Sequence, residues 1–213
     1  MTILHHPSEE VLLDLAAGRL GRGPALVVGA HVRACPACRV ATDRFEAVGG
    51  ALLEAEPPAA MAPDALARAL ARIGAPHPPD PPPARVVVGG IDLSEVLGEA
   101  PLGPRRALGP GLSLHPILND RATGASTYLL RSGPGRRLAR HGHTGAEFVC
   151  VLTGSFSDET GRYGVGDFAC SDDKLVHSPV TDSDGDCICL ISAEGPMRMQ
   201  GPIGKLIQPL LGL

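Results

Sequence analysis

The spacing of apolar residues along this chain changes from a helical period to a strand period. In the first third of the sequence, apolar positions recur three or four residues apart and predict four helices. Their expected ranges are 9–17, 24–32, 36–53 and 63–73. The first helix has a typical start, because Ser8 can cap it and Glu9 and Glu10 place negative charge in its first turn. An all-α segment is therefore expected at the beginning of the chain.

A proline-rich stretch separates this segment from the strand pattern. Residues 74–83 read Gly-Ala-Pro-His-Pro-Pro-Asp-Pro-Pro-Pro, and proline removes backbone donors and fixes φ, so they predict a stiff, extended linker. Beyond the linker, apolar and polar residues alternate in runs such as 126–130, 147–152 and 187–191, which predicts strands. The expected fold class is multidomain α and β, with a four-helix domain over 1–74, the linker over 75–85 and an all-β domain over 86–213.

Composition and charge exclude several classes of protein. The 213 residues carry a net charge of −4 and no basic run or aromatic-interleaved patch, so direct nucleic-acid binding is not expected. The N-terminus lacks the pattern of a signal peptide, and no stretch of about 18 apolar residues could span a membrane. We therefore expect a cytoplasmic protein without a membrane partner. Disulfides are rare in that compartment, so we expect the six cysteines to be metal ligands or reactive thiols rather than structural disulfides.

The β segment contains a metal-binding pattern, His141-x-His143-x3-Glu147. Residues two apart on a strand point to the same face, so His141 and His143 can both face inward. Glu147 has the same parity, and His177 on a later strand would complete a set of three histidines and one carboxylate. Imidazole and carboxylate together suit zinc, iron, manganese, nickel or copper, so the pattern predicts a divalent metal without identifying it.

With Gly135 before it and Gly154 after it, this spacing resembles the first motif of the cupin family and implies a cupin β-barrel. The second cupin motif is only partly present. Gly166 and His177 have the right separation, but the usual Pro-x-Gly between them is missing and Thr181 stands where an Asn is usual. The alternative is a cupin that has lost its metal, and the retention of all four ligand positions argues against it.

The helical segment carries a second pattern, His31-x3-Cys35-x2-Cys38. On a helix His31 and Cys35 share one face, and the proline after Cys35 should turn the chain and bring Cys38 back. Two thiolates and one imidazole need a fourth ligand to close a tetrahedral zinc site, and His5 and His6 are the nearby candidates. The alternative is a reduced cysteine pair packed in the core.

Together the two patterns resemble the ChrR-type anti-sigma factors, in which a zinc-binding anti-sigma domain precedes a cupin domain. The resemblance extends over nearly the whole chain and includes residues 1–3, 5–6, 47–50, 158–160, 186–190 and 205–206. It implies two zinc sites. The implied ligands of the first are His6, His31, Cys35 and Cys38, and those of the second, which could also hold another divalent metal, are His141, His143, Glu147 and His177.

The resemblance also implies an inhibitor of an alternative sigma factor of the extracytoplasmic-function type. By the same resemblance, singlet oxygen or organic peroxide stress is expected to release that sigma factor, and the cupin domain is expected to be needed for the release but not for inhibition. The amphipathic helices around 9–17, 40–53 and 64–73 carry more apolar surface than a small domain can hide, so we expect them to pack on the sigma factor. Whether the cupin domain also pairs with a second copy stays open.

How the signal acts is a hypothesis at this stage. Cys187 and Cys189 share one face of a strand, and oxidation of either thiol or of a metal ligand would loosen the barrel; ordinary buried cysteines are the alternative. The competing function is a metal-dependent cupin enzyme, a dioxygenase or isomerase. Its acid–base candidates, Glu159 and Asp167, are close only in sequence, and it gives the N-terminal cysteines no role. We therefore expect a regulatory binding protein without catalytic residues.

Overall fold

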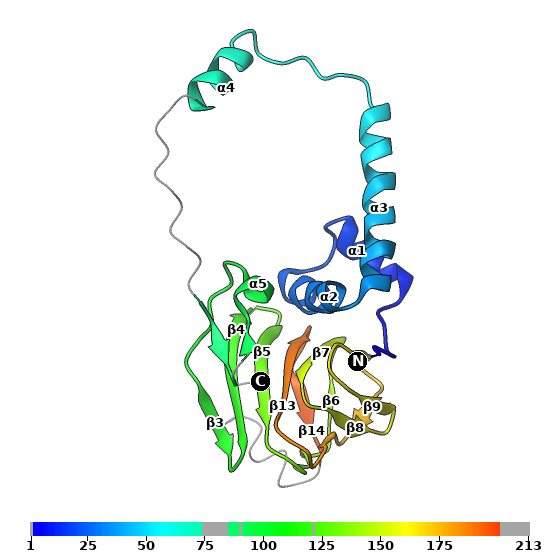
Figure 1. Ribbon diagram of the computed structural model, residues 1–213, viewed down its shortest axis with the longest axis vertical. Helices are drawn as coiled ribbons and strands as arrows, with labels where there is room; N and C mark the ends of the chain where they lie inside the picture. Colours follow the sequence, from blue (N-terminus) through cyan, green and yellow to red (C-terminus); the bar gives the residue numbers. More distant parts are fainter. Residues whose placement is uncertain (1, 74–84, 90, 121, 201–213) are drawn as a thin grey trace.

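Four helices precede a β-sandwich in the computed structural model, which describes residues 2–73, 85–89, 91–120 and 122–200 (Figure 1). The helices are α1 (Glu9–Ala16), α2 (Arg22–Ala34), α3 (Pro36–Ala55) and α4 (Ala65–Ile73). Their ends differ from the predicted ones by two residues at most, so the prediction of four helices is confirmed. The predicted linker over 75–85 lies, apart from Arg85, outside the described residues.

Local sequence explains how the first three helices begin and end. The Ser8 hydroxyl accepts a hydrogen bond from the backbone N–H of Val11 at 3.3 Å and caps α1. Cys35 has extended backbone angles between α2 and α3, and Pro36 occupies the first turn of α3, where its missing N–H costs nothing. This break turns the chain between Cys35 and Cys38, as the proline predicts.

The strands form several antiparallel sheets that pack together as a sandwich. They are β1 (Val87–Val88), β2 (Ile91–Asp92), β3 (Arg106–Gly109), β4 (Leu112–Asn119), β5 (Ser126–Ser132), β6 (His141–His143), β7 (Glu147–Thr153), β8 (Phe156–Asp158), β9 (Gly161–Tyr163), β10 (Phe168–Ser171), β11 (Val176–His177), β12 (Val180–Thr181), β13 (Cys187–Ala193) and β14 (Met197–Met199), with the short helix α5 (Ser94–Leu97) after β2. A six-stranded antiparallel sheet, β10-β7-β13-β5-β4-β3, is accompanied by two three-stranded sheets, β11-β6-β14 and β12-β8-β9, and by the β1–β2 pair. Pairing among the described strands does not close into a ring, so the expected barrel is present as a sandwich.

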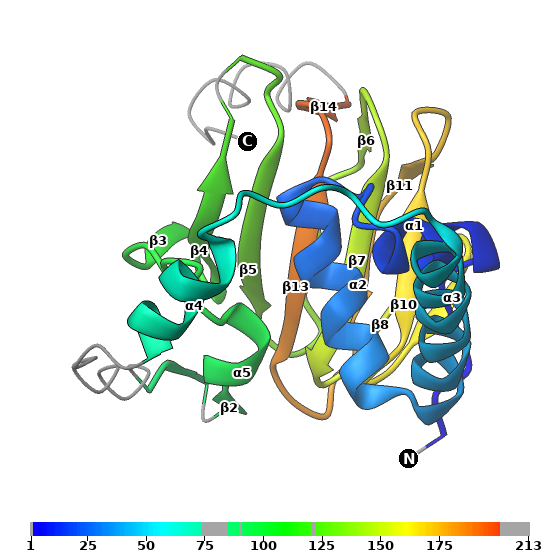
Figure 2. The same ribbon diagram turned by 90° about the horizontal axis from the view of Figure 1, so that it is seen from above.

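The six-stranded sheet buries both of its faces, because its strands carry apolar residues at successive positions. On β13, Cys189 and Ile191 belong to the core inside the sandwich, whereas Leu190 belongs to a second core on the outer face. Helix α2 lies across that outer face, and its Val27 and Val28 are fully buried there (Figure 2). Helices α1 to α3 and the sheet therefore share one hydrophobic core.

Close contact between α2 and the sheet gives a testable difference between two glycines of one helix. A Cβ on Gly23 would lie 2.3 Å from Thr127 Oγ1 and 2.5 Å from Ser192 Oγ, whereas a Cβ on Gly29 would meet nothing within 4 Å. We expect Gly23→Ala to lower the free energy of unfolding by about 1–3 kcal/mol through overpacking. Gly29→Ala is the matched control and should raise it by about 0.5–1 kcal/mol. Urea unfolding midpoints measure both changes, and equal shifts for the two variants would contradict this packing.

The apolar faces predicted to meet a partner are not all free. On α1, Leu12 is buried and Val11 and Leu15 pack against the shared core, so most of this face is intramolecular. In contrast, α3 rises away from the sandwich and α4 lies far above it (Figure 1). No residue of α4 is buried by the described part of the chain. No helix within that part is long and apolar enough to cross a membrane.

Candidate metal centres

Four side chains from three segments converge beneath α3. His31 lies in the last turn of α2, Cys35 at the break, Cys38 in the first turn of α3, and His6 in the extended N-terminal segment. His6 Nδ1 is 3.4 Å from both sulfurs, and His31 Nε2 is 3.2 Å from Cys38 Sγ. The donor atoms of a tetrahedral zinc site lie roughly 3.4–3.8 Å apart. This His2Cys2 cluster therefore has the spacing and the donor types of such a site.

The structure separates the two neighbouring histidines at the N-terminus. His6 faces the sulfurs, and it is the one exposed member of the cluster. His5 points to the sandwich instead, where its Nε2 lies 3.0 Å from the carbonyl oxygen of Arg162. Its ring lies 4.5 Å from the ring of Tyr163. Only His6 is thus placed to serve as the fourth ligand.

Hydrogen bonding prepares His31 for a cation. Its Nδ1 lies 2.7 Å from the carbonyl oxygen of Gly166, which can only accept, so Nδ1 carries the proton and the Nε2 lone pair faces Cys38. Burial lowers the pKa of His31, which keeps the ring neutral. Burial, together with the neighbouring Cys35, raises the pKa of Cys38 to about 12 in the absence of a metal. Metal binding at this cluster would therefore release thiol protons and depend on pH.

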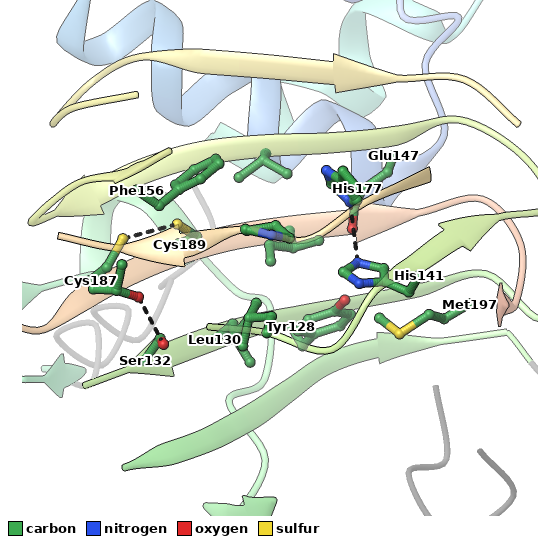
Figure 3. A pocket seen from close by; sticks show the side chains of 15 residues that line it. Tyr128, Leu130, Ser132, His141, Glu147, Phe156, His177, Cys187, Cys189 and Met197 are labelled. Atoms are coloured by element: carbon green, nitrogen blue, oxygen red, sulfur yellow. Dashed lines mark hydrogen bonds and ion pairs between the residues drawn. The ribbon is translucent and has the colours of Figure 1, made fainter. Parts of the chain in front are cut away.

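A second cluster lies inside the sandwich. His141 and His143 stand at the two ends of β6. Glu147 begins β7, and His177 ends β11, where it pairs with His141 in the strand register (Figure 3). His141 Nε2 and His177 Nε2 are 3.2 Å apart. Glu147 Oε2 lies 3.2 Å from His143 Nε2 and 3.9 Å from His177 Nε2. The structure thus brings all four predicted side chains together as a His3Glu cluster.

The hydrogen bonds of these histidines fit a bound cation. Nδ1 of His141 donates to the carbonyl oxygen of Ala139 at 2.7 Å, and Nδ1 of His177 lies 2.9 Å from Asp158 Oδ2. Each ring is then left with its Nε2 to offer to a cation, and the two Nε2 atoms face each other. Nδ1 of buried His143 has no hydrogen-bond partner among the described residues, and its Nε2, 3.2 Å from Glu147 Oε2, lacks hydrogen-bond geometry. A metal ion would satisfy one of these nitrogens.

The charge of the cluster also suits a metal. Burial alone would raise the pKa of Glu147, but the three histidines beside it outweigh burial and hold the pKa below its usual value. Burial likewise opposes ionisation of Asp158, but His177 and Thr160 hold the pKa of this carboxyl at about 2. Both carboxylates are therefore ionised at neutral pH, Glu147 within the cluster and Asp158 behind His177.

Asp158 contacts the His3Glu cluster through His177, although motif spacing did not single it out. It lies at the end of β8, on a different sheet from Glu147, and its contact with His177 is purely tertiary. The two acid–base candidates have other roles. Glu159 is exposed, accepts from the backbone of Ser178 and pairs with Arg140. Asp167 binds the N-terminal segment, outside the sandwich.

Asp158→Asn tests the role of this carboxylate. The amide cannot hold His177 through a charged hydrogen bond, so we expect the divalent-metal affinity of the His3Glu cluster to fall about 10–100-fold. The His2Cys2 cluster should keep its affinity, because Asp158 does not contact it. Competition with a chelator on the full chain measures both sites. Asp120→Asn, in an exposed turn, is the control, and an unchanged affinity of the His3Glu cluster in Asp158→Asn would contradict the assignment.

A small cavity adjoins the His3Glu cluster. Its volume is about 70 Å³, and its walls include Tyr128, Phe156, Cys187 and Cys189 (Figure 3). This space holds a few waters or a molecule of similar size. Cys187 Sγ and Cys189 Sγ are 3.6 Å apart, and both side chains are buried. The neighbouring Cys187 and burial raise the pKa of Cys189 well above its usual value, so it is a protonated and weakly nucleophilic thiol.

A helical region that carries a His2Cys2 cluster precedes a cupin-like sandwich that carries a His3Glu cluster, and comparison with known proteins identifies the family that has this order of regions. Residues 103–198 match the family model of the ChrR cupin-like domain. The chain is 36% identical over 212 residues to the anti-sigma-E factor ChrR of Cereibacter sphaeroides, and the match covers 98% of both chains. It is also similar to the crystal structure of Rhodobacter sphaeroides SigE in complex with the anti-sigma ChrR, with a TM-score of 0.74, 35% identity and coverage of 90% of this chain and 99% of that one.

The chain belongs to the ChrR family. This confirms the predicted family resemblance and the predicted cupin fold. The cupin-like match ends just before β14 does, so it contains all four members of the His3Glu cluster. The match over 98% of the chain extends the likeness to the helical region.

Proposed function

We propose that this protein is an anti-sigma factor that binds an alternative sigma factor of the extracytoplasmic-function type and keeps it from RNA polymerase. The match to the anti-sigma-E factor ChrR over 98% of the chain supports this function, as does the likeness to ChrR in its complex with SigE. Its action is binding rather than catalysis, and we place it in the cytoplasm, where sigma factors meet polymerase.

The observation that carries the proposal is a set of exposed apolar side chains on α3, on α4 and on the segment between them, which we call the α3–α4 face. Its members are Val48, Leu52, Leu53, Met61, Leu66, Leu70 and Ile73, each at least 59% exposed. On α4, Leu66, Leu70 and Ile73 follow one another at helical spacing and form a continuous stripe. Burying one such side chain contributes about 1.5–3 kcal/mol, so covering the stripe would stabilise a complex strongly. A sigma factor held between α3 and α4 provides that cover.

The His2Cys2 cluster sets the direction of α3 in this proposal. It joins the N-terminal segment, the end of α2 and the start of α3, and the proposed metal there is zinc, bound by His6, His31, Cys35 and Cys38. A structural zinc would hold α3 away from the sandwich, with its apolar side free for the partner. Without the zinc ion, the N-terminal segment, the end of α2 and the start of α3 would lose the ligand bonds that join them.

The His3Glu cluster is the proposed sensor. Its proposed ligands are His141, His143, Glu147 and His177, and they would hold zinc or another divalent metal. The adjoining cavity of about 70 Å³ admits small oxidants, which agrees with release by singlet oxygen or organic peroxide stress. The protonated state of Cys189 makes a metal ligand the better target of oxidation than this thiol.

Inhibition of transcription tests the proposal. An extracytoplasmic-function sigma factor of the same organism would be combined with core polymerase and a promoter that it recognises, with and without the full chain. We expect transcription to fall in proportion to added protein until the two are equimolar. A housekeeping sigma factor is the control and should be unaffected. Undiminished transcription at molar excess of this protein would contradict the proposed function.

A further inference from the structure

A carbonyl of the sandwich orients one member of the His2Cys2 cluster. The carbonyl oxygen of Gly166 accepts from His31 Nδ1 at 2.7 Å, across the boundary between helices and sandwich. Gly166 has φ +86°, and a Cβ there would lie 2.7 Å from Ile3 Cδ1 and 3.7 Å from Ala34 Cβ. The positive φ and the close contact with Ile3 both favour glycine at this position. A glycine of the second cupin motif therefore serves the cluster of the helical region.

The next residue, Asp167, binds the segment that carries His6. Its Oδ1 accepts from the backbone N–H of Leu4 at 2.7 Å and of His5 at 3.0 Å, and its side chain is buried. The backbone N–H of Phe168 then donates to the carbonyl oxygen of His5 at 3.1 Å. The residues immediately before His6 are thus held by three hydrogen bonds to the sandwich.

These contacts belong to an edge strand that reaches the other cluster. β10 begins at Phe168 and pairs with β7, Phe168 opposite Cys150 and Ser171 opposite Glu147. The ring of Phe168 also lies 5.8 Å from the ring of His31. One end of β10 therefore touches the His2Cys2 cluster through Phe168. At the other end, Ser171 pairs with Glu147, which is a member of the His3Glu cluster.

We propose that Gly166, Asp167 and Phe168 are positioning residues of the His2Cys2 cluster, which reaches its full metal affinity only while the helical region is docked on the sheet. They orient two of its four members, His6 and His31, through backbone and carboxylate contacts. Contacts that fix a metal ligand are typically worth 10–100-fold in affinity. The inference rests on the metal site proposed above. Through these contacts the sandwich would influence metal binding in the region that would bind the sigma factor.

Cobalt binding to the full chain tests this role. Thiolate-to-cobalt charge transfer reports the His2Cys2 cluster alone, because the members of the His3Glu cluster have only nitrogen and oxygen donors. We expect Asp167→Ala to lower the Co²⁺ affinity at this absorption band about 10–100-fold, with the His3Glu cluster still filled. Asp167→Asn should recover part of the loss, because its amide oxygen can still accept from Leu4 and His5. The control is Asp172→Ala, whose carboxylate accepts from two backbone N–H groups within its own loop, and it should bind as the unaltered chain does.

Two further measurements keep the result decisive. Ile3 is a half-buried residue of the N-terminal segment that packs against Gly166. Ile3→Ala removes this contact without altering the sheet, and it should also weaken Co²⁺ binding. Hydrogen exchange of the Leu4 and His5 amides should accelerate in metal-free Asp167→Ala. Accelerated exchange with unaltered Co²⁺ affinity in both variants would overturn this inference and leave the metal site standing. No charge-transfer band in the unaltered chain would instead contradict the metal site itself.

Discussion

Replacing Cys35 and Cys38 together by serine is expected to empty the His2Cys2 cluster and abolish sigma-factor binding. Both sulfurs lie within 3.4 Å of His6 Nδ1, so the double substitution removes half of the donor set at its centre. Structural zinc contributes on the order of 10–16 kcal/mol in small metal-folded peptides, which is far more than the remaining contacts of the N-terminal segment can replace. The start of α3 would then lose its attachment to the end of α2 and to the N-terminus.

Metal analysis and a binding titration measure this outcome. The zinc content should fall from about two per chain to about one, since the His3Glu cluster is on the opposite side of the sheet. Sigma-factor binding should become undetectable at micromolar concentration. Cys170→Ser is the control, because Cys170 is exposed and outside both clusters. If the double variant kept both metal ions, or bound the sigma factor fully without a metal in the His2Cys2 cluster, the structural role of this cluster would be contradicted.

Leu66→Asp with Leu70→Asp is expected to weaken sigma-factor binding about 100- to 10,000-fold while leaving the free protein intact. The two leucines are 69% and 59% exposed, so their replacement leaves no cavity in the chain itself. In a complex, each lost leucine contact removes about 1.5–3 kcal/mol, and each buried carboxylate adds a desolvation cost. The loss should be visible mainly as faster dissociation.

The same variant separates a binding surface from a folding defect. Its metal content and its unfolding midpoint should match those of the unaltered chain, because exposed positions usually change stability by less than about 0.5 kcal/mol. Val87→Asp, at an exposed position of β1 in the cupin region, is the matched control and should bind normally. A double variant that binds with unchanged affinity would remove the α3–α4 face from the interface.

Periodicity sufficed for the types and ranges of the helices and for the alternation of the main strands. Spacing also sufficed to group His31 with Cys35 and Cys38, because four residues span one helical turn and Pro36 forces the following break. It could not choose between His5 and His6. Adjacent residues in an extended segment point in opposite directions, and only the position of Asp167 decides which one faces the sulfurs.

The shared core and the outer contacts of the clusters were beyond sequence reasoning. An amphipathic stretch shows that a face is covered but not by what, so α1 and α4 look alike in the sequence although only α1 is packed against the rest of the chain. Asp158 and Asp167 act through tertiary contacts between strands and segments far apart in the chain. No local pattern distinguishes such carboxylates from solvated ones.

We expect this protein to hold a sigma factor through a metal-organised helical region. Co-expression with an extracytoplasmic-function sigma factor of the same organism, followed by purification and metal counting, is the most direct test. A stable one-to-one complex with about two zinc ions is expected, and it should be lost when Cys35 and Cys38 are replaced. A protein that purifies alone and carries iron or copper in the His3Glu cluster would contradict it.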